Sequence, residues 1–262
     1  MLLNSVILVL REVLEAAVLV SVLLALAHNV RLRNHWLWYA LPLSGLCVLA
    51  YSGSLGTLTA ALDGAGQEVT NASLQGAVFL LILPILCLCT AFPLSGQRRP
   101  LGAFMTLAVT FAIVRECAEI QIYVQAFATA GDQATAVWAG SALGAGIGLS
   151  AGVLVYAALR ALAPAASRRA CLVALGLIGA GMVMQATMLL EQVDWLPHQA
   201  PLWDSSGLIS ERSFLGELLY AVLGYEATPG ALQVALYGGS LALAVAAVAV
   251  GWKWRVSGET TA

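Results

Sequence analysis

Charged residues are scarce in this sequence. Aspartate, glutamate, lysine and arginine together make up 10% of the 262 residues, whereas a soluble domain carries roughly 25%. The mean hydropathy is +0.87, and 60% of the residues are hydrophobic. This composition excludes an ordinary soluble domain and predicts an all-α integral membrane protein.

Histidine is also rare, and this excludes some metal chemistry. Zinc and di-iron sites in helical bundles place His close to Glu at short spacing. His28 and His35 lie between the first two apolar runs, and His198 lies in a long polar segment, so none stands beside a carboxylate within a run. We therefore expect neither a membrane di-iron oxidase nor any other enzyme, and no permanently bound cofactor.

Nucleotide-binding motifs and basic patches are missing as well. No glycine-rich phosphate-binding sequence is present, which argues against direct use of ATP. The basic residues are spread along the chain, so nothing suggests nucleic-acid binding. All five cysteines fall in or beside apolar runs, where disulfides are not expected; they are Cys47, Cys87, Cys89, Cys117 and Cys171.

Seven apolar runs are each long enough to cross a bilayer, which takes about 20 residues. They cover residues 2–27, 36–60, 72–92, 101–128, 135–159, 170–190 and 231–252. A glycine-rich turn at 63–68 separates the second run from the third, and a long outer segment, 191–230, separates the sixth from the seventh. The first run lacks a basic leader and carries charges, which favours a retained helix over a cleaved signal peptide. We take residues 1–262 as one transmembrane domain.

The basic residues predict the orientation, because Lys and Arg are retained on the cytoplasmic side of a membrane. Nine of the twelve follow odd-numbered runs: Arg31, Arg33, Arg98, Arg99, Arg160, Arg168, Arg169, Lys253 and Arg255. Only Arg212 falls on the opposite side. The N-terminus is therefore predicted outside and the C-terminus in the cytoplasm, with an acidic outer face that attracts cations.

Two charged motifs interrupt the apolar runs. Arg11-Glu12-Val13-Leu14-Glu15 lies in the first run, and Arg115-Glu116-Cys117-Ala118-Glu119 repeats the pattern R-E-x-x-E in the fourth. A charge at mid-membrane costs about 2.5–3.5 kcal/mol on insertion scales, so such charges must be paired or bind a ligand. At about 100° per residue, the three charged side chains of each motif share one helix face.

The spacing of the motifs predicts an inverted repeat. The first and fourth runs cross the membrane in opposite directions, so runs one to three and four to six form two halves of opposite orientation. Transporters built this way bind their substrate near the midplane, between the halves. Both motifs lie near mid-depth and are expected to face each other. Gly140, Gly144 and Gly148, four residues apart, predict close helix packing in the fifth run.

Glu12, Glu15, Glu116 and Glu119 are hard oxygen ligands that suit a di- or trivalent cation. Arg11 and Arg115 can neutralise these carboxylates until a cation displaces them. Carboxylates also suit Mg²⁺ and Ca²⁺, so ligand type alone does not select one metal. The alternative is an internal Arg–Glu lock between two helices. Such a lock does not explain why each motif holds a second carboxylate.

The paired motifs, the seven runs and the outer sequence LWDSSGL at 202–208, followed by Leu-Gly-Tyr at 223–225, resemble the oxidase-dependent iron permease family, including bacterial EfeU-type permeases. The resemblance covers essentially the whole chain. It implies high-affinity uptake of iron, as Fe³⁺ or Fe²⁺, across the bacterial cytoplasmic membrane. The motif glutamates and arginines would form the iron pathway. A periplasmic ferroxidase or iron-binding protein would deliver the iron, and a homo-oligomer is possible.

The sequence departs from that family at three positions. Many family motifs read R-E-G-x-E, whereas Val13 and Cys117 occupy the glycine position here. These side chains narrow the approach to the backbone, and Cys117 either packs or adds a soft ligand. In the third run Gln75 stands where we expect an acidic residue in the family. Its carbonyl could coordinate a cation, or its amide could bond another helix.

Several polar residues outside the motifs are candidate accessory ligands. Gln125 falls near the outer end of the fourth run, where it either lines the cation path or bonds another helix. Residues 210–220 predict a short amphipathic helix at the membrane interface, with Phe214 on its apolar side and Glu211 opposite. Asp204, Glu211 and Glu217 either receive iron from a partner or belong to a solvated cap.

Two other functions remain open at this stage. The first is a permease for another metal, such as Mn²⁺, Pb²⁺ or Cu(I). Thioethers suit Cu(I), and Met182, Met184 and Met188 are close in sequence, although they also pack well in apolar cores. The second is a membrane anchor or electron-transfer subunit, which would move no metal by itself.

Overall fold

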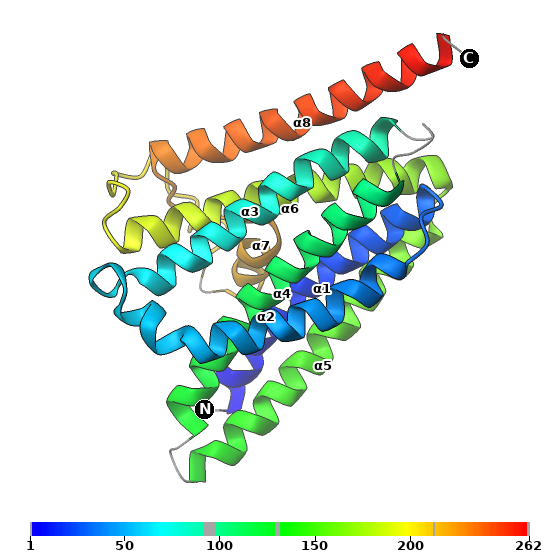
Figure 1. Ribbon diagram of the computed structural model, residues 1–262. Helices are drawn as coiled ribbons and strands as arrows, with labels where there is room; N and C mark the ends of the chain where they lie inside the picture. The colour runs from blue at the N-terminus through cyan, green and yellow to red at the C-terminus, as the bar shows by residue number, and fades with distance from the viewer. Residues whose placement is uncertain (1, 92–97, 129–131, 212, 261–262) are drawn as a thin grey trace.

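The computed structural model describes residues 2–91, 98–128, 132–211 and 213–260, and these form helices whose connections are short except the one that follows residue 192 (Figure 1). The helices are α1 (Leu2–Asn29), α2 (His35–Ala60), α3 (Gly66–Ala91), α4 (Arg98–Ala128), α5 (Asp132–Ala161), α6 (Pro164–Gln192), α7 (Phe214–Leu223) and α8 (Ala231–Thr260), with a 3₁₀ turn at Leu62–Gly64. Helices suit a membrane because they satisfy every backbone hydrogen bond internally.

The long helices alternate in direction, so the bundle has two distinct ends (Figure 1). The end that carries the N-terminus, the α2–α3 turn and the segment 193–230 is called the N-side here. The opposite end, which carries the 30–34 loop, the α5–α6 connection and the C-terminus, is called the C-side. The basic residues that predicted the orientation and have described side chains lie on the C-side. Arg212 and the side chain of Arg98 lie outside the described residues.

Six helices are long and apolar enough to cross a membrane: α2, α3, α4, α5, α6 and α8. Helix α7 is apolar but only 10 residues long. Helix α1 is 28 residues long and carries the first charged motif; it is not among the six. The chain is therefore a polytopic all-α membrane protein, as its composition predicted.

The helices extend beyond the apolar runs that predicted them. Helix α3 begins at Gly66 instead of residue 72, so the glycine-rich turn ends at Ala65, and the predicted end at residue 92 lies outside the described residues. Helix α6 begins at Pro164 and α8 reaches Thr260. Hydropathy detects only the hydrocarbon core, whereas a helix continues through the interface because its backbone bonds still form.

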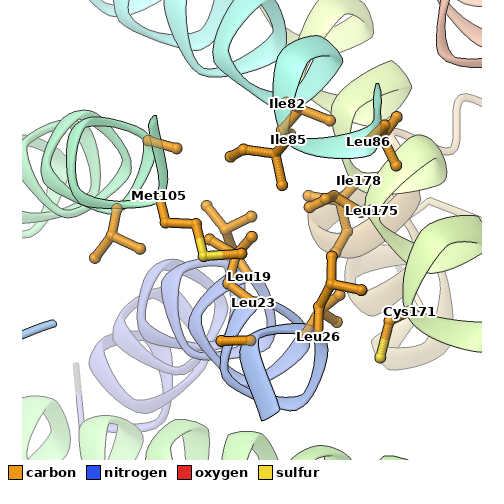
Figure 2. Close-up of a cluster of buried hydrophobic side chains, with 14 of the residues drawn as sticks. Leu19, Leu23, Leu26, Ile82, Ile85, Leu86, Met105, Cys171, Leu175 and Ile178 are labelled. Atoms are coloured by element: carbon orange, nitrogen blue, oxygen red, sulfur yellow. The ribbon is translucent and has the colours of Figure 1, made fainter. Parts of the chain in front are cut away.

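A hydrophobic cluster fills the C-side half of the bundle (Figure 2). Helix α1 contributes Leu19, Leu23 and Leu26, and these side chains meet residues of α3, α4 and α6. The side chains labelled opposite them are Ile82, Ile85, Leu86, Met105, Cys171, Leu175 and Ile178. Each of these three leucines has no exposed surface. This plug, named the apolar plug below, lies between the charged motifs and the C-side.

Helix α5 lies against α1 through its glycines, as their spacing predicted. A Cβ at Gly140 would lie 2.6 Å from the carbonyl oxygen of Leu2, and a Cβ at Gly144 only 2.5 Å from that of Val6. Side chains at these positions would therefore push the helices apart. Ser21 Oγ also donates a hydrogen bond of 2.7 Å to the carbonyl oxygen of Gly152. The two helices thus form one closely packed pair.

Candidate metal site

The two charged motifs meet inside the bundle. Helices α1 and α4 contact each other, and each places its Arg and two Glu on one face, because residues three and four apart are neighbours on a helix. The resulting set, called the carboxylate cluster here, consists of Arg11, Glu12, Glu15, Arg115, Glu116 and Glu119. The predicted meeting of the motifs is confirmed.

Arg115 is the centre of this cluster. Its Nη1 donates to Glu15 Oε2 on the opposite helix at 2.6 Å and to Glu116 Oε1 at 2.7 Å. Its Nη2 lies 3.0 Å from Glu119 Oε1 and 4.0 Å from Glu12 Oε2. One guanidinium therefore faces all four carboxylates, which its planar arrangement of donors makes possible.

Arg11 lies at the edge of the cluster and has fewer partners. Its Nη2 donates to Glu12 Oε1 at 2.6 Å and lies 3.8 Å from Glu119 Oε2. The guanidinium carbon also lies 5.8 Å from the ring centroid of Tyr220, which is within the range of a cation–π contact. Tyr220 belongs to α7, so this short helix closes one side of the cluster.

Local signals fix α7 in this position. Ser213 caps its N-terminus by accepting a hydrogen bond from the Gly216 amide at 3.0 Å, and Gly224 ends it with a left-handed φ of 66°. A Cβ at Gly224 would lie 2.6 Å from Gly181 Cα. The prediction of a helix over 210–220 is thus wrong at its start, since Glu211 precedes the helix instead of lying on its polar face. Phe214, predicted on the apolar side, is 60% exposed.

Burial changes across the cluster. Glu12, Glu15 and Glu116 are at most 4% exposed, and Arg115 is also 4% exposed. In contrast, the side chain of Arg11 is 33% exposed and that of Glu119 is 22% exposed. Arg11 precedes Glu12 on α1, and Glu119 follows Glu116 on α4, so both lie toward the N-side. The cluster is open toward the N-side and closed by the apolar plug toward the C-side.

Three buried carboxylates retain oxygen atoms that accept no hydrogen bond within the described part of the chain. These atoms are Glu12 Oε2, Glu15 Oε1 and Glu116 Oε2. Such groups are costly to bury unless a ligand satisfies them. The three residues also offer ligand atoms that lie within 4.8 Å of one another. Hard cations bind oxygen at about 2.0–2.6 Å, so opposite ligands are about 4–5 Å apart, and the cluster matches that size.

The charge of the cluster favours a cation. Four carboxylates and two guanidinium groups leave two negative charges in excess when all are ionised. Opposite charges attract more strongly inside a protein than in water. Two arginines would need only two carboxylates to form a neutral set of Arg–Glu pairs. The cluster has four, so two carboxylates exceed what a lock between the helices requires. The arrangement can therefore hold a metal ion by carboxylate oxygen alone.

The accessory residues lie outside this arrangement. Gln75 Nε2 donates a hydrogen bond of 2.6 Å to Gln185 Oε1. This is a bond between two helices, one of the two roles considered for Gln75. The Oε1 atom of Gln75 is buried without a partner among the described residues. Gln125 is exposed near the N-side end of α4. Asp204 is exposed and accepts hydrogen bonds from Ser206, which lower the pKa of its carboxyl group.

The segment 193–230 contains its own acidic pair. Glu211 Oε1 accepts a hydrogen bond from the Ala227 amide at 2.7 Å and thereby fixes the chain beside Glu226. Partial burial, together with the adjacent Glu211 carboxylate, raises the pKa of Glu226 to about 7. Glu217 is half-buried in the first turn of α7. None of these acids is part of the cluster of carboxylates that could share one cation in the described chain.

Val13 and Cys117 line an apolar cavity of about 390 Å³ together with Glu116. Val13 packs on α5, where a Cβ at Gly148 would lie 3.0 Å from its Cγ1. Val13 thus packs between α1 and α5, whereas for Cys117 the structure shows only a place on the cavity wall beside Glu116. All five cysteines are free in the structure.

Tyr220, which lies beside the cluster, and Gln185, which bonds the Tyr220 backbone, could not be identified from the sequence pattern. Tyr220 lies over Arg11 although 209 residues separate them. Gln185 bonds Gln75 and also donates to the backbone oxygen of Tyr220 at 3.3 Å, which ties α7 to α3 and α6. A buried glutamine in an apolar helix was the only available signal, and it does not identify the partner.

Comparison with known proteins identifies the family. The sequence model of the iron permease FTR1 family matches residues 90–260, which is about two thirds of the chain and includes the second motif. The first motif lies outside the matched residues. No curated protein and no solved structure gave a significant match. The chain therefore belongs to the iron permease FTR1 family, whose members are transporters and not enzymes.

Proposed function

We propose that this protein takes up iron across the bacterial cytoplasmic membrane through the carboxylate cluster. Glu12, Glu15, Glu116 and Glu119 bind the ion, and Arg11 and Arg115 neutralise them between transport cycles. The observation that carries this proposal is the set of three buried carboxylates, Glu12, Glu15 and Glu116, which offer oxygen atoms within 4.8 Å of one another. Each of them also keeps one oxygen without a hydrogen-bond partner among the described residues. Family membership supports iron as the transported ion.

The proposed topology has seven crossings within one domain of residues 1–262, with α1 as the crossing additional to the six apolar helices. Its length of 28 residues and its position along α5, which spans the bundle, support this assignment. The N-terminus lies outside and the C-terminus lies in the cytoplasm, because the basic residues gather on the C-side.

Helices α1–α3 and α4–α6 form the two halves of an inverted repeat in this proposal. A two-fold relation between the halves exchanges α1 with α4, α2 with α5 and α3 with α6. The contacts support it: α1 packs on α5 as α2 packs on α4, α1 packs on α6 as α4 packs on α3, and α3 packs on α6. The carboxylate cluster lies between the halves, where transporters of this type bind substrate.

The iron ion reaches the cluster from the N-side, past Arg11 and Glu119, which are its exposed members. Arg11 has fewer partners than Arg115, so it is displaced first. The carboxylates then close around the ion, and release requires the apolar plug to separate. The membrane potential assists a cation moving inward by about 2.3 kcal/mol per charge for each 100 mV.

Asp204, Glu211 and Glu217 receive iron from a periplasmic iron-binding protein or ferroxidase, and Gln75 and Gln125 line its path. The acidic composition of the 193–230 segment supports this role, because a negative face raises the local concentration of cations. The ion arrives as Fe³⁺ or Fe²⁺, and the protein works in the bilayer alone or as a homo-oligomer.

Uptake of radioactive iron by cells that lack their own iron transport tests the proposal. We expect the wild type to transport and Glu15→Gln and Glu119→Gln to lose transport, with protein amounts in the membrane unchanged. Glu68→Gln, the same change outside the cluster, should transport normally. Normal uptake by both cluster variants would show that the carboxylates only lock the helices together. Competition of iron uptake by Mn²⁺, Pb²⁺ or Cu(I) tests for a permease of another metal. Uptake by the purified protein in vesicles tests for an anchor or electron-transfer subunit, which would move no metal by itself.

A further inference from the structure

A second cavity lies on the C-side of the bundle, away from the carboxylate cluster. It has a volume of about 640 Å³ and opens between the start of α2 and the start of α4. Its wall includes Arg33, His35, Trp36, Tyr39, Arg99 and Leu107. Leu107 and Arg115 are eight residues apart on α4, which is about 12 Å along a helix. The cavity therefore has no part in the proposed metal site.

The polar wall of this cavity is basic. Arg33 and Arg99 are both exposed, and neither is paired with an acidic side chain within the described ranges. His35 adds a third group that can carry positive charge, while no carboxylate lines the cavity. Guanidinium groups bind phosphate oxygens through paired N–H donors. The wall is thus complementary to a phosphate group and not to a cation.

Trp36 provides a further donor. Its side chain is only 3% exposed, yet the indole Nε1–H is buried and meets no acceptor in the part of the chain that the structure describes. Its backbone carbonyl oxygen accepts a hydrogen bond from Thr106 Oγ1 at 3.0 Å, which holds the beginning of α2 against α4. A buried N–H without an acceptor is costly. Trp36 lines the cavity, but its Nε1 atom has almost no accessible surface, so a ligand oxygen reaches it only when the indole shifts toward the cavity.

The remainder of the cavity is exposed and largely apolar. Tyr39 is 69% exposed and Leu107 is 38% exposed, and the neighbouring Trp38 is 76% exposed. Helix α2, on which both aromatic residues lie, has little buried surface over its apolar stretch. Tryptophan and tyrosine gather at the level of the lipid head groups. The basic wall therefore lies at head-group depth, with apolar surface beside it.

We propose that this cavity binds an anionic phospholipid. Arg33 and Arg99 bind the head-group phosphate, the Trp36 N–H donates to a phosphate or ester oxygen, and an acyl chain lies against Tyr39 and Leu107. Basic pockets between membrane helices hold acidic lipids in this manner. The lipid joins the start of α2 to the start of α4 and so stabilises their contact.

Native mass spectrometry of the purified full-length protein tests this site, with phosphatidylglycerol and phosphatidylcholine as probes. The wild type should bind one phosphatidylglycerol at least fivefold more tightly than phosphatidylcholine. The double variant Arg33→Gln/Arg99→Gln should lose that preference. The matched control Arg160→Gln/Arg169→Gln, which removes two exposed charges from the same end of the bundle, should keep it within twofold.

Two further measurements distinguish the source of the phosphate and the role of the indole. Inorganic phosphate at millimolar concentration should not displace phosphatidylglycerol; displacement would show a site for free phosphate and overturn the proposal. Trp36→Phe, which removes the N–H and keeps an aromatic ring, should weaken phosphatidylglycerol binding while the protein unfolds at nearly the wild-type temperature. Equal loss of lipid preference in both arginine double variants would indicate general surface charge and would refute the site.

Discussion

Replacing Arg115 by Met should destabilise this protein more than removing any one carboxylate of the cluster. Arg115 is 4% exposed, donates hydrogen bonds to Glu15 and Glu116, and forms an ion pair with Glu119. Removing one partner of a buried ion pair costs about 3–5 kcal/mol, because the charge left behind has no compensation. The loss of Arg115 leaves four carboxylates with Arg11 alone.

Removing one carboxylate of the cluster should destabilise the protein less than removing Arg115. Glu116→Gln leaves Arg115 paired with Glu15 and Glu119. When all groups of the cluster are ionised, the substitution also lowers the excess negative charge from two to one. The variant loses one charged hydrogen bond of about 1.5–3 kcal/mol but is relieved of like-charge repulsion. We expect a net loss below about 1.5 kcal/mol, once the two contributions partly cancel.

Thermal unfolding of the purified protein with a thiol-reactive dye measures both effects, because Cys89 and Cys171 have no exposed surface until the bundle opens. In a chain of this size each kcal/mol moves the midpoint by about 2–4 °C, so Arg115→Met should unfold about 6–20 °C lower. Arg160→Met, an exposed arginine with the same change, should move it by less than about 2 °C. If Arg115→Met and Arg160→Met unfold at the same temperature, pairing with Arg115 does not stabilise the buried carboxylates, and the reasoning is refuted.

Three other perturbations test separate parts of the structure. Gly144→Val should prevent close packing of α5 on α1, because its Cβ would lie 2.5 Å from a backbone oxygen, whereas Gly146→Val, with nothing within 4 Å, should express and unfold normally. The raised pKa of Glu226, about 7, means that the folded segment holds a proton which the unfolded chain releases at lower pH. The stability that this group contributes is therefore present below its unfolded pKa and is lost as the pH rises through 7. The protection of the amides of residues 213–230 from hydrogen exchange, corrected for the intrinsic exchange rate at each pH, should fall over that range, and Glu226→Gln should abolish this fall. Tyr220→Leu should weaken the hold on Arg11 by about 0.5–2 kcal/mol, while Tyr220→Phe keeps the ring and should unfold like the wild type.

The sequence was sufficient to predict the charged face of each motif helix. Helical geometry alone puts Glu12 and Glu15 together, and the cost of burying charge requires the two motifs to meet. The individual pairs could not be predicted, because all four carboxylates are chemically equivalent candidates for either arginine. The distances that make Arg115 the centre and leave Arg11 at the edge depend on the crossing of α1 and α4.

The position of α7 beside the cluster could not be predicted from the hydrophobic pattern of the sequence. Its sequence, Phe-Leu-Gly-Glu-Leu-Leu-Tyr, is amphipathic enough to suggest a helix lying on a membrane surface. Instead Ser213 and Gly224 limit it to 10 residues, and Gly181 lets it approach α6 closely. The contact of Tyr220 with Arg11 joins residues far apart in the sequence. Such a contact leaves no periodic pattern in the sequence, so the pattern cannot predict it.

The packing of the helices indicates which contact must break for a cation to pass. Helix α1 is joined closely to α5, and α4 packs on α2, so the two motif helices belong to different packed pairs. The bond from Arg115 to Glu116 stays within α4, but the bond of 2.6 Å from Arg115 to Glu15 crosses from one pair to the other. Any rocking of the pairs that opens the apolar plug changes this crossing distance. In the proposed transport cycle, a cation bound by Glu15 replaces the guanidinium there and so weakens the direct hydrogen bond from Arg115 to α1. In that cycle, binding of the ion itself loosens the contact between α1 and α4.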